Sequence, residues 1–263
     1  MMNWKEMPAW QHLQKYRPLL YELVVRDLKV KYRRSFLGYL WSLLNPLLMM
    51  AVMSFVFSYI FRYDIENYPL YLICGQTLWG FFNESTNMAM YSVLQNGSLI
   101  KKVYIPKFIF PMSRVFSSFV TMSFSLGAIL IVMLVTRAPL HWQLLLFPLP
   151  LILLLLFAMG VSMVLSSLSV YFRDVTHLYS VVTLAWMYVT PVFYPVSALP
   201  DEVAWVLKLN PMYYYLDNFR QLVLYGSLPT AKSWCICLLC SGVALAVGLA
   251  VFRKLQRNFI LYL

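Results

Sequence analysis

Long apolar runs, separated by short polar segments, dominate the pattern of the chain. Six of the runs approach the ~20 residues with which a helix crosses the ~30 Å hydrocarbon core of a bilayer. The pattern therefore predicts an all-α polytopic membrane protein with spanning helices at about 36–61, 68–91, 108–136, 144–171, 178–194 and 234–252. Pro46 is expected to kink the first helix near its cytoplasmic end. Pro148 and Pro150 indicate that the fourth helix is re-entrant or broken near these residues.

An amphipathic pattern precedes the first run, within residues 8–34. Its apolar positions recur at helical spacing: Leu19, Leu20, Leu23, Val24, Leu28 and Tyr32. Charged residues, most of them cations, fill many of the positions between them. A helix of this kind lies in the membrane interface with its cations at anionic head groups. Residues 1–34 are therefore predicted to form an amphipathic helix on the cytoplasmic face, in preference to a solvated tail.

A second amphipathic pattern lies between the fifth and sixth runs, within residues 195–232. Apolar side chains recur at helical period on both sides of Pro211, and Pro200 precedes them. Two short helices that enter the outer leaflet fit this pattern better than a soluble domain does. The predicted organisation is thus the 1–34 helix followed by one six-helix domain, 35–263, with a cytoplasmic loop at about 95–107 and a re-entrant outer segment at about 195–232.

Composition supports a single membrane domain. Hydrophobic residues make up 61% of the chain, charged residues make up 12%, and the mean hydropathy is +0.69. Soluble proteins carry about 25% charged residues, so a soluble fold of this size could not cover its surface with so few charges.

The net charge of +11 sits in clusters beside the apolar runs, not in a patch on one polar face. This placement argues against nucleic-acid binding, and it follows the positive-inside rule. The clusters lie within residues 5–34, at Lys101, Lys102 and Lys107, and at Arg253, Lys254 and Arg257. Both ends of the chain and the 95–107 loop are therefore predicted to be cytoplasmic, whereas Asn67 and Asp201 are predicted to face the outside.

Motifs for catalysis are mostly absent from the sequence, and one pattern resembles a metal-binding motif. The chain has no G-x-x-x-x-G-K-[ST] phosphate loop, so it cannot hold ATP in that way. Its three histidines lie in separate segments. Cys237 and Cys240 have C-x-x-C spacing, but no fourth ligand or polar turn accompanies them, so free thiols in a helix are favoured over zinc. We therefore expect no catalytic residue, no metal site and no cofactor in this chain.

Two sets of residues are candidates for contact with polar cargo. Glu84 is the acid well inside a predicted spanning helix, where a charge is costly; an interhelical hydrogen-bond cluster is favoured over a cargo site. Aromatic side chains, whose faces stack on sugars, crowd the outer end: Tyr188, Phe193, Tyr194, Trp205, Tyr213, Tyr214 and Tyr215. They are predicted to line a sugar path, although a lipid-facing aromatic belt accounts for about half of them.

Four stretches resemble the permease subunits of type-2 ABC transporters that export O-antigen, capsule, teichoic acid and related cell-wall polysaccharides. They are 32–41 (YRRSFLGYLW) with Asn45-Pro46, 99–107 (LIKKVYIPK), 170–175 (VYFRDV), and 191–195 (PVFYP) with Asn210-Pro211-Met212. Their order and spacing cover nearly the whole chain, so the resemblance is specific for the family but not for the sugar. The 253–260 tail departs from the family, because it lacks the acidic residue common near this position in relatives. No contact is predicted for this tail.

The resemblance implies a homodimer, a channel at the dimer interface, and two copies of a cytoplasmic ATPase that hold ATP and Mg²⁺. It implies a coupling helix in the 95–107 loop, with ATPase contacts from Asn96, Leu99, Ile100, Lys101, Lys102, Val103 and Tyr104. It also implies that the 1–34 helix is a gate helix at the inner interface, with Arg26, Lys29, Tyr32, Arg33 and Arg34 along it.

The function expected from these observations is that of a non-enzymatic transport subunit that exports a lipid-linked polysaccharide. It would lie in the bacterial cytoplasmic (inner) membrane as a multi-pass protein, in contact with membrane lipids, with both termini in the cytoplasm. An exporter of a drug or small lipid is the alternative from the same superfamily. A membrane-embedded glycosyl- or acyltransferase is disfavoured, because no acids or histidines converge near one interface.

Overall fold

The computed structural model describes residues 9–33, 35–60, 65, 67–198 and 200–263, and every regular element in this part of the chain is a helix. The α-helices are α1 (Ala9–Tyr32), α2 (Trp41–Ile60), α3 (Tyr68–Gln95), α4 (Gly97–Lys102), α5 (Ile109–Val135), α6 (Pro148–Tyr171), α7 (Val175–Val189), α8 (Asp201–Leu209), α9 (Pro211–Val223), α10 (Ala231–Leu255) and α11 (Phe259–Tyr262). Short 3-10 helices are η1 (Gly38–Leu40), η2 (Trp142–Leu146), η3 (Val196–Ala198) and η4 (Gln256–Asn258). The prediction of an all-α protein is confirmed.

Four helical segments of the described chain are long and apolar enough to cross a membrane. They are Gly38–Phe57, Ile109–Val135, Trp142–Tyr171 and Ala231–Tyr262, and they match the first, third, fourth and sixth predicted spans. α3 covers the second prediction with 28 residues but contains a polar stretch at 83–87. α7 covers the fifth with 15 residues, fewer than the ~20 of a span along the membrane normal. The chain is a multi-pass membrane protein, and the count of six spans stays a prediction.

Proline positions explain the outer end of the fourth predicted helix. Pro148 stands in the first turn of α6, directly after η2. A proline costs little there, because the first N–H groups of a helix have no partner within it. The break predicted near Pro148 and Pro150 is therefore a change from a 3-10 helix to an α-helix within one apolar segment.

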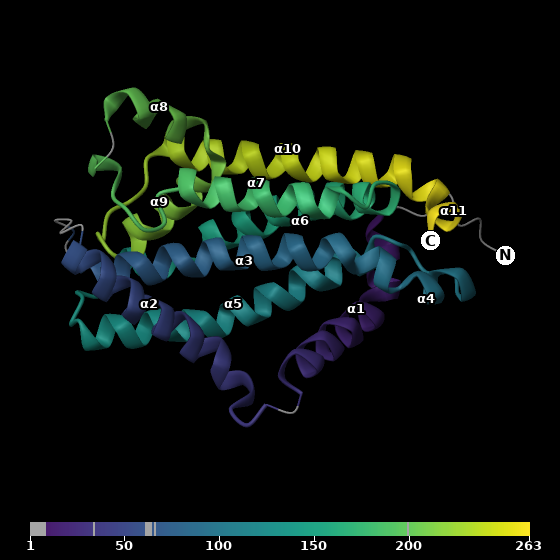
Figure 1. The fold of residues 1–263 in the computed structure, drawn as a ribbon, viewed down its shortest axis with the longest axis horizontal. Coiled ribbons are helices and arrows are strands. Elements are labelled where there is room, and N and C mark those ends of the chain that lie inside the picture. The colour runs from purple at the N-terminus through teal and green to yellow at the C-terminus, as the bar shows by residue number, and fades with distance from the viewer. Residues whose placement is uncertain (1–8, 34, 61–64, 66, 199) are drawn as a thin grey trace.

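The long helices form a bundle (Figure 1). α6 packs along α10, and α3 packs against both α5 and α6. α1 and α2 run obliquely to the bundle, and each of them contacts α5. α4 and α11 lie at one end of the bundle, and α8 lies at the opposite end (Figure 1). The 95–107 loop and the 195–232 segment are thus at opposite ends, as the predicted topology requires.

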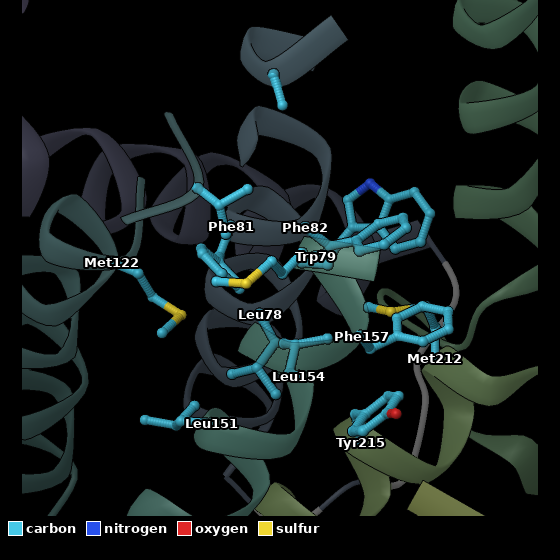
Figure 2. Close-up of a cluster of buried hydrophobic side chains, with 14 of the residues drawn as sticks. Leu78, Trp79, Phe81, Phe82, Met122, Leu151, Leu154, Phe157, Met212 and Tyr215 are labelled. Atoms are coloured by element: carbon cyan, nitrogen blue, oxygen red, sulfur yellow. The ribbon is translucent and has the colours of Figure 1, made fainter. Parts of the chain in front are cut away.

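Buried leucine, methionine and aromatic side chains pack together between the helices (Figure 2). The ring centroid of Phe82 in α3 lies 5.2 Å from that of Trp186 in α7 and 5.6 Å from that of Phe157 in α6. Tyr215 of α9 extends the cluster, with its ring centroid 5.5 Å from that of Phe157. The pairs are edge-to-face, stacked and tilted in turn, and such aromatic contacts add to the effect of apolar burial. The cluster fixes α3, α6, α7 and α9 relative to one another.

The backbones of α6 and α10 touch directly. A Cβ atom on Gly160 would overlap the backbone of Ala244, and a Cβ atom on Gly248 would overlap the backbone of Gly160. Close approach at small residues lets membrane helices gain van der Waals contact where lipid tails leave no hydrophobic driving force. Ser241 adds a polar link between the helices, because its hydroxyl donates to the carbonyl of Leu153 at 2.8 Å.

Two short helices, α8 and α9, occupy the outer segment where two were predicted. Asn210 caps α9, since its Oδ1 accepts from the backbone N–H of Met212 at 3.0 Å. The same oxygen accepts from Nε1 of Trp186 at 2.8 Å, which ties the start of α9 to α7. α9 packs against α6 and α10. That either helix enters the outer leaflet stays a prediction.

Candidate functional site

A groove of about 420 Å³ lies between the end of α1, the first half of α2, and faces of α3, α5 and α7. Its polar lining residues are Lys31, Ser42, Asn45, Gln76, Thr77, Glu84, Ser118, Thr121 and Ser125, and its aromatic ones are Tyr32, Trp41, Trp79, Phe81 and Phe193. On α3, Gln76, Gly80 and Glu84 recur every four residues, so one face of that helix supplies much of the wall. Polar side chains gathered within an apolar bundle mark this groove as the candidate site.

Three buried polar atoms that belong to lining residues have no hydrogen-bond partner: Oη of Tyr32, Oε1 of Gln76 and Oγ1 of Thr77. The described part of the chain has seven such atoms, so nearly half of them belong to this groove. Leaving a buried polar atom unpaired costs about 1–3 kcal/mol. A hydroxyl group both donates and accepts, so it is a type of partner that suits all three atoms.

An ion pair ties α1 to the wall of the groove. Nζ of Lys31 donates to Oε1 of Glu84 at 2.7 Å, and the hydroxyl of Ser118 in α5 donates to the same oxygen at 3.4 Å. Both charged side chains are about one-third exposed, so the pair contributes ~1 kcal/mol or less to stability. Glu84 therefore links helices, as the sequence favours, and it also lines the groove.

Asp27 of α1 forms a second tie to α5. Its side chain is 3% exposed, and its Oδ1 lies 3.1 Å from nitrogens of both Arg114 and Arg26. The hydroxyl of Ser117 donates to Oδ2 at 3.5 Å. Removing one partner of a buried carboxylate is strongly destabilising, because the charge is then left uncompensated. Sequence reasoning missed this tie, because Asp27 stands among the charged residues of α1 and is indistinguishable by position from a residue of its exposed polar face.

Of the predicted gate-helix residues, Arg26, Lys29 and Tyr32 lie along the last two turns of α1, and Arg33 follows its end. Arg34 falls outside the described residues. Tyr32 lines the groove, Arg26 contacts Asp27, and Lys29 and Arg33 are exposed. The apolar face of α1 packs on the core through Leu19, Leu20 and Leu23. The segment is thus helical, and its place in the membrane interface and its role as a gate stay predictions.

The seven aromatic residues predicted for the sugar path lie in different places. Phe193 lines the groove, and Tyr215 has no exposed surface. The others lie on or beside α7, α8 and α9: Tyr188, Tyr194, Trp205, Tyr213 and Tyr214. Of the predicted path residues, the structure brings Glu84 and Phe193 together in the groove, and the role of the others stays a prediction.

The predicted coupling residues lie on and beside α4, at the end of the bundle (Figure 1). Exposed ones are Lys101, Lys102, Val103 and Tyr104, whereas Asn96, Leu99 and Ile100 are buried or half-buried. Two cations beside two exposed apolar side chains form a surface that fits a partner with an apolar cleft and an acidic rim.

Sequence reasoning missed most of the polar residues that make the groove. Asn45, Gln76, Thr77, Thr121 and Ser125 each stand alone among apolar neighbours or in short polar groups within predicted spans. A signal was present, because a polar side chain inside a spanning helix needs a partner or a function.

A buried cation, also missed, fixes the outer end of the groove. Arg220 of α9 is 4% exposed, and its Nη atoms donate to the carbonyls of Pro191, Val192 and Tyr71 at 2.7, 3.0 and 3.1 Å. Its guanidinium lies 3.4 Å from the centroid of the Tyr71 ring. The 191–195 segment that Arg220 holds against α3 includes Phe193, so Arg220 helps to place a residue of the groove.

The groove offers hydrogen-bonding groups and aromatic faces. Among the described residues, no three His, Cys, Asp or Glu side chains lie close enough together to hold a metal ion. The four cysteines, one in α3 and three in α10, are free thiols.

Known proteins similar to this chain are export permeases. The family model described as "ABC-2 type transporter" matches residues 4–224. The O-antigen export system permease protein RfbA of Myxococcus xanthus is 32% identical over 95% of this chain and 96% of its own. RfbA of Klebsiella pneumoniae is 31% identical over 92% of this chain and 93% of its own. The capsule polysaccharide export inner-membrane protein CtrC of Neisseria meningitidis serogroup A is 24% identical over 90% of each chain.

Proposed function

This chain belongs to the ABC-2 type transporter family, as a permease of polysaccharide export, and from this premise we propose that it moves a lipid-linked polysaccharide across the bacterial cytoplasmic membrane. A partner ATPase, present in two copies, holds ATP and Mg²⁺ and supplies the energy. α4 receives the movement of the ATPase, and α1 gates the inner end of the path.

The observation that supports this proposal most directly is the set of unpartnered polar atoms along the groove. Sugar hydroxyls would bond to Gln76, Thr77 and Tyr32, and sugar faces would stack on aromatic rings such as Trp41. Each contact is weak, and an exporter needs weak, repeated contacts so that the chain moves on, as in multi-site pores.

A second copy of the chain completes the path in this proposal. The apolar window of α2 is only 6% buried within one chain, and Leu48, Val52 and Phe55 of α2 are exposed. Met49, on the same helix, lines the groove. A second copy that covered α2 would therefore also close the open side of the groove. In this arrangement α3 and α7 complete six spans, with both termini and α4 in the cytoplasm.

Replacing Gln76 with leucine and Thr77 with valine tests the groove. The double variant should export about tenfold less polysaccharide, because two hydrogen bonds to the glycan are lost at about 0.5–1.5 kcal/mol each. Its thermal unfolding midpoint should rise, because two unpaired buried atoms are removed. Surface polysaccharide at matched protein level and the unfolding midpoint of purified protein are the measurements.

The matched control is Ser123→Ala, on the exposed side of α5, which should change neither quantity. Normal export from the double variant would place the glycan path elsewhere. Lower export combined with a lower unfolding midpoint would show that Gln76 and Thr77 hold the helices together instead.

Replacing Lys101, Lys102 and Tyr104 with alanine tests the ATPase contact. Truncating a buried aromatic anchor costs on the order of 2 kcal/mol or more, so the amount of copurified ATPase and its stimulated hydrolysis should both fall. Lys208→Ala with Lys232→Ala removes two exposed cations from the opposite end and should leave both unchanged. If the triple variant kept full complex stability and full export, the loop would not contact the ATPase, and its cations would serve only to set the orientation of the chain in the membrane.

A further inference from the structure

The 256–263 segment follows the last spanning helix and packs at the end of the bundle that carries α4 (Figure 1). It consists of η4 and α11. Phe259 is fully buried, and its ring centroid lies 5.5 Å from that of Phe252 and 6.1 Å from that of Tyr171. The sequence predicts no contact for this tail, so its packing needs an explanation.

The segment touches both ends of the loop that contains α4. At the start of the loop, a Cβ atom on Gly97 would lie 3.4 Å from Cδ2 of Leu263, so these two residues are neighbours. At the end of the loop, Nζ of Lys107 donates to the carbonyl of Gln256 at 2.6 Å. The same Nζ lies 5.6 Å from the centroid of the Phe259 ring. One short segment thus holds the 97–107 loop at two points.

The segment is also bonded to the end of α6. The hydroxyl of Tyr171 donates to the carbonyl of Leu255 at 2.8 Å, and its ring centroid lies 4.6 Å from that of Tyr262. The last carbonyls of a helix lack partners within it and carry the negative end of its dipole. Tyr171 and Lys107 supply donors to carbonyls there, and the carbonyl of Gln256 also accepts from the backbone N–H of Phe259. Partial burial lowers the pKa of Lys107.

We propose that the 256–263 segment is a brace that positions α4 on α6 and α10, so that a displacement of α4 moves both helices. The inference rests on the proposed function, in which α4 receives the movement of the ATPase. Without the brace, α4 would be held by its own apolar residues Leu99 and Ile100, which pack on the core, and by its chain links at Asn96 and the extended residue Val103. These contacts lie on one side of a six-residue helix, so α4 would tilt as the ATPase closes. Lys107, Phe259 and Leu263 act as positioning residues, since they work through α4.

Lys107→Met tests the brace, because it removes the bond to Gln256 and leaves the exposed surface of α4 unchanged. In proteoliposomes containing this protein and its ATPase, the amount of bound ATPase should equal that of wild type. The polysaccharide exported per ATP hydrolysed should fall about fivefold. Lys107→Arg keeps a donor and should restore the ratio, and Leu261→Ala, at a residue that is 80% exposed, should leave it unchanged. A merely structural role would lower the amount of folded protein without changing the ratio.

A cross-link tests whether α4 and the segment move as one body. With Gly97→Cys and Leu263→Cys, the two Cβ atoms would be 3.6 Å apart, within the ~3.5–4.5 Å range of a disulfide. Oxidised and reduced protein should export at the same rate, with the two single-cysteine variants as controls.

Two results would overturn the brace: export that stops on oxidation and returns on reduction, or an unchanged ratio in Lys107→Met. A failure of the proposed function gives a different result, because wild-type protein would then bind no ATPase. When wild type binds ATPase and exports polysaccharide while Lys107→Met keeps the full ratio, only the brace is wrong.

Discussion

Replacing Arg220 with leucine should lower the thermal unfolding midpoint sharply and reduce the yield of folded protein. The substitution removes the donors from the carbonyls of Pro191, Val192 and Tyr71, and it removes the cation from the face of the Tyr71 ring. Each buried carbonyl that loses its donor costs about 1–3 kcal/mol. The combined loss is expected to exceed about 3 kcal/mol, which lies in the tail of single-substitution effects.

Heating the detergent-solubilised protein and measuring the monodisperse fraction by size-exclusion chromatography gives the midpoint. Lys232→Leu, an exposed cation at the start of α10, is the matched control and should unfold like wild type. Arg220→Lys should recover only part of the loss, because an ammonium group lacks the planar fork that reaches several acceptors. If Arg220→Leu were as stable as wild type but exported no polysaccharide, the result would instead indicate that Arg220 contacts the glycan.

The helices were predictable because a bilayer demands them. Backbone polar groups in hydrocarbon must bond within the segment, so each long apolar run becomes a helix. α5 and α10 begin and end within three residues of the predicted runs. Proline marked the outer helices, since Pro200 precedes α8 and Pro211 starts α9. α3 and α7 show the limit of this argument, because α3 contains a polar stretch at 83–87 and α7 has only 15 residues.

The groove was not predictable, because it depends on which helix faces meet. Lys31 and Glu84 are 53 residues apart in the chain, and only the packing of α1 brings their charged atoms to 2.7 Å. Periodicity identifies the polar face of a helix but not the partner of that face. For the same reason no sequence signal pairs Leu263 with Gly97, which the fold places in contact.

The consecutive tyrosines of α9 show why a dense run of aromatic residues does not define a surface. Successive residues on an α-helix point about 100° apart, because a turn takes 3.6 residues. Tyr215 therefore turns into the core, where its hydroxyl donates to the carbonyl of Cys237 at 3.0 Å. Tyr213 and Tyr214 are only half-buried. The sequence shows how many aromatic residues are present, but the direction in which each side chain leaves the helix determines whether a ligand can reach it.

Gly160→Ala should prevent the normal packing of α6 on α10, although it adds a single methyl group. The new Cβ atom would overlap backbone atoms of Ala244 and Leu245, and a helix backbone cannot turn aside as a flexible side chain can. The two helices must separate, which removes van der Waals contact and lengthens the bond from Ser241 to the carbonyl of Leu153. Overpacking a core costs about 1–3 kcal/mol even where side chains yield. We therefore expect little folded protein and no export.

A loss of stability in Gly160→Ala would be informative, because helix propensity alone predicts a gain. Alanine is favoured over glycine in a helix interior by about 1 kcal/mol. Gly242, also on α10, has no atom within 4 Å of an added Cβ, so Gly242→Ala should keep or raise the unfolding midpoint. Gly248→Ala should repeat the damage, since its Cβ would overlap the backbone of Gly160. Unfolding midpoints of the three variants, measured side by side, separate helix propensity from packing. Equal gains in all three would mean that α6 and α10 do not touch, and that lipid or a second copy of the chain lies between them.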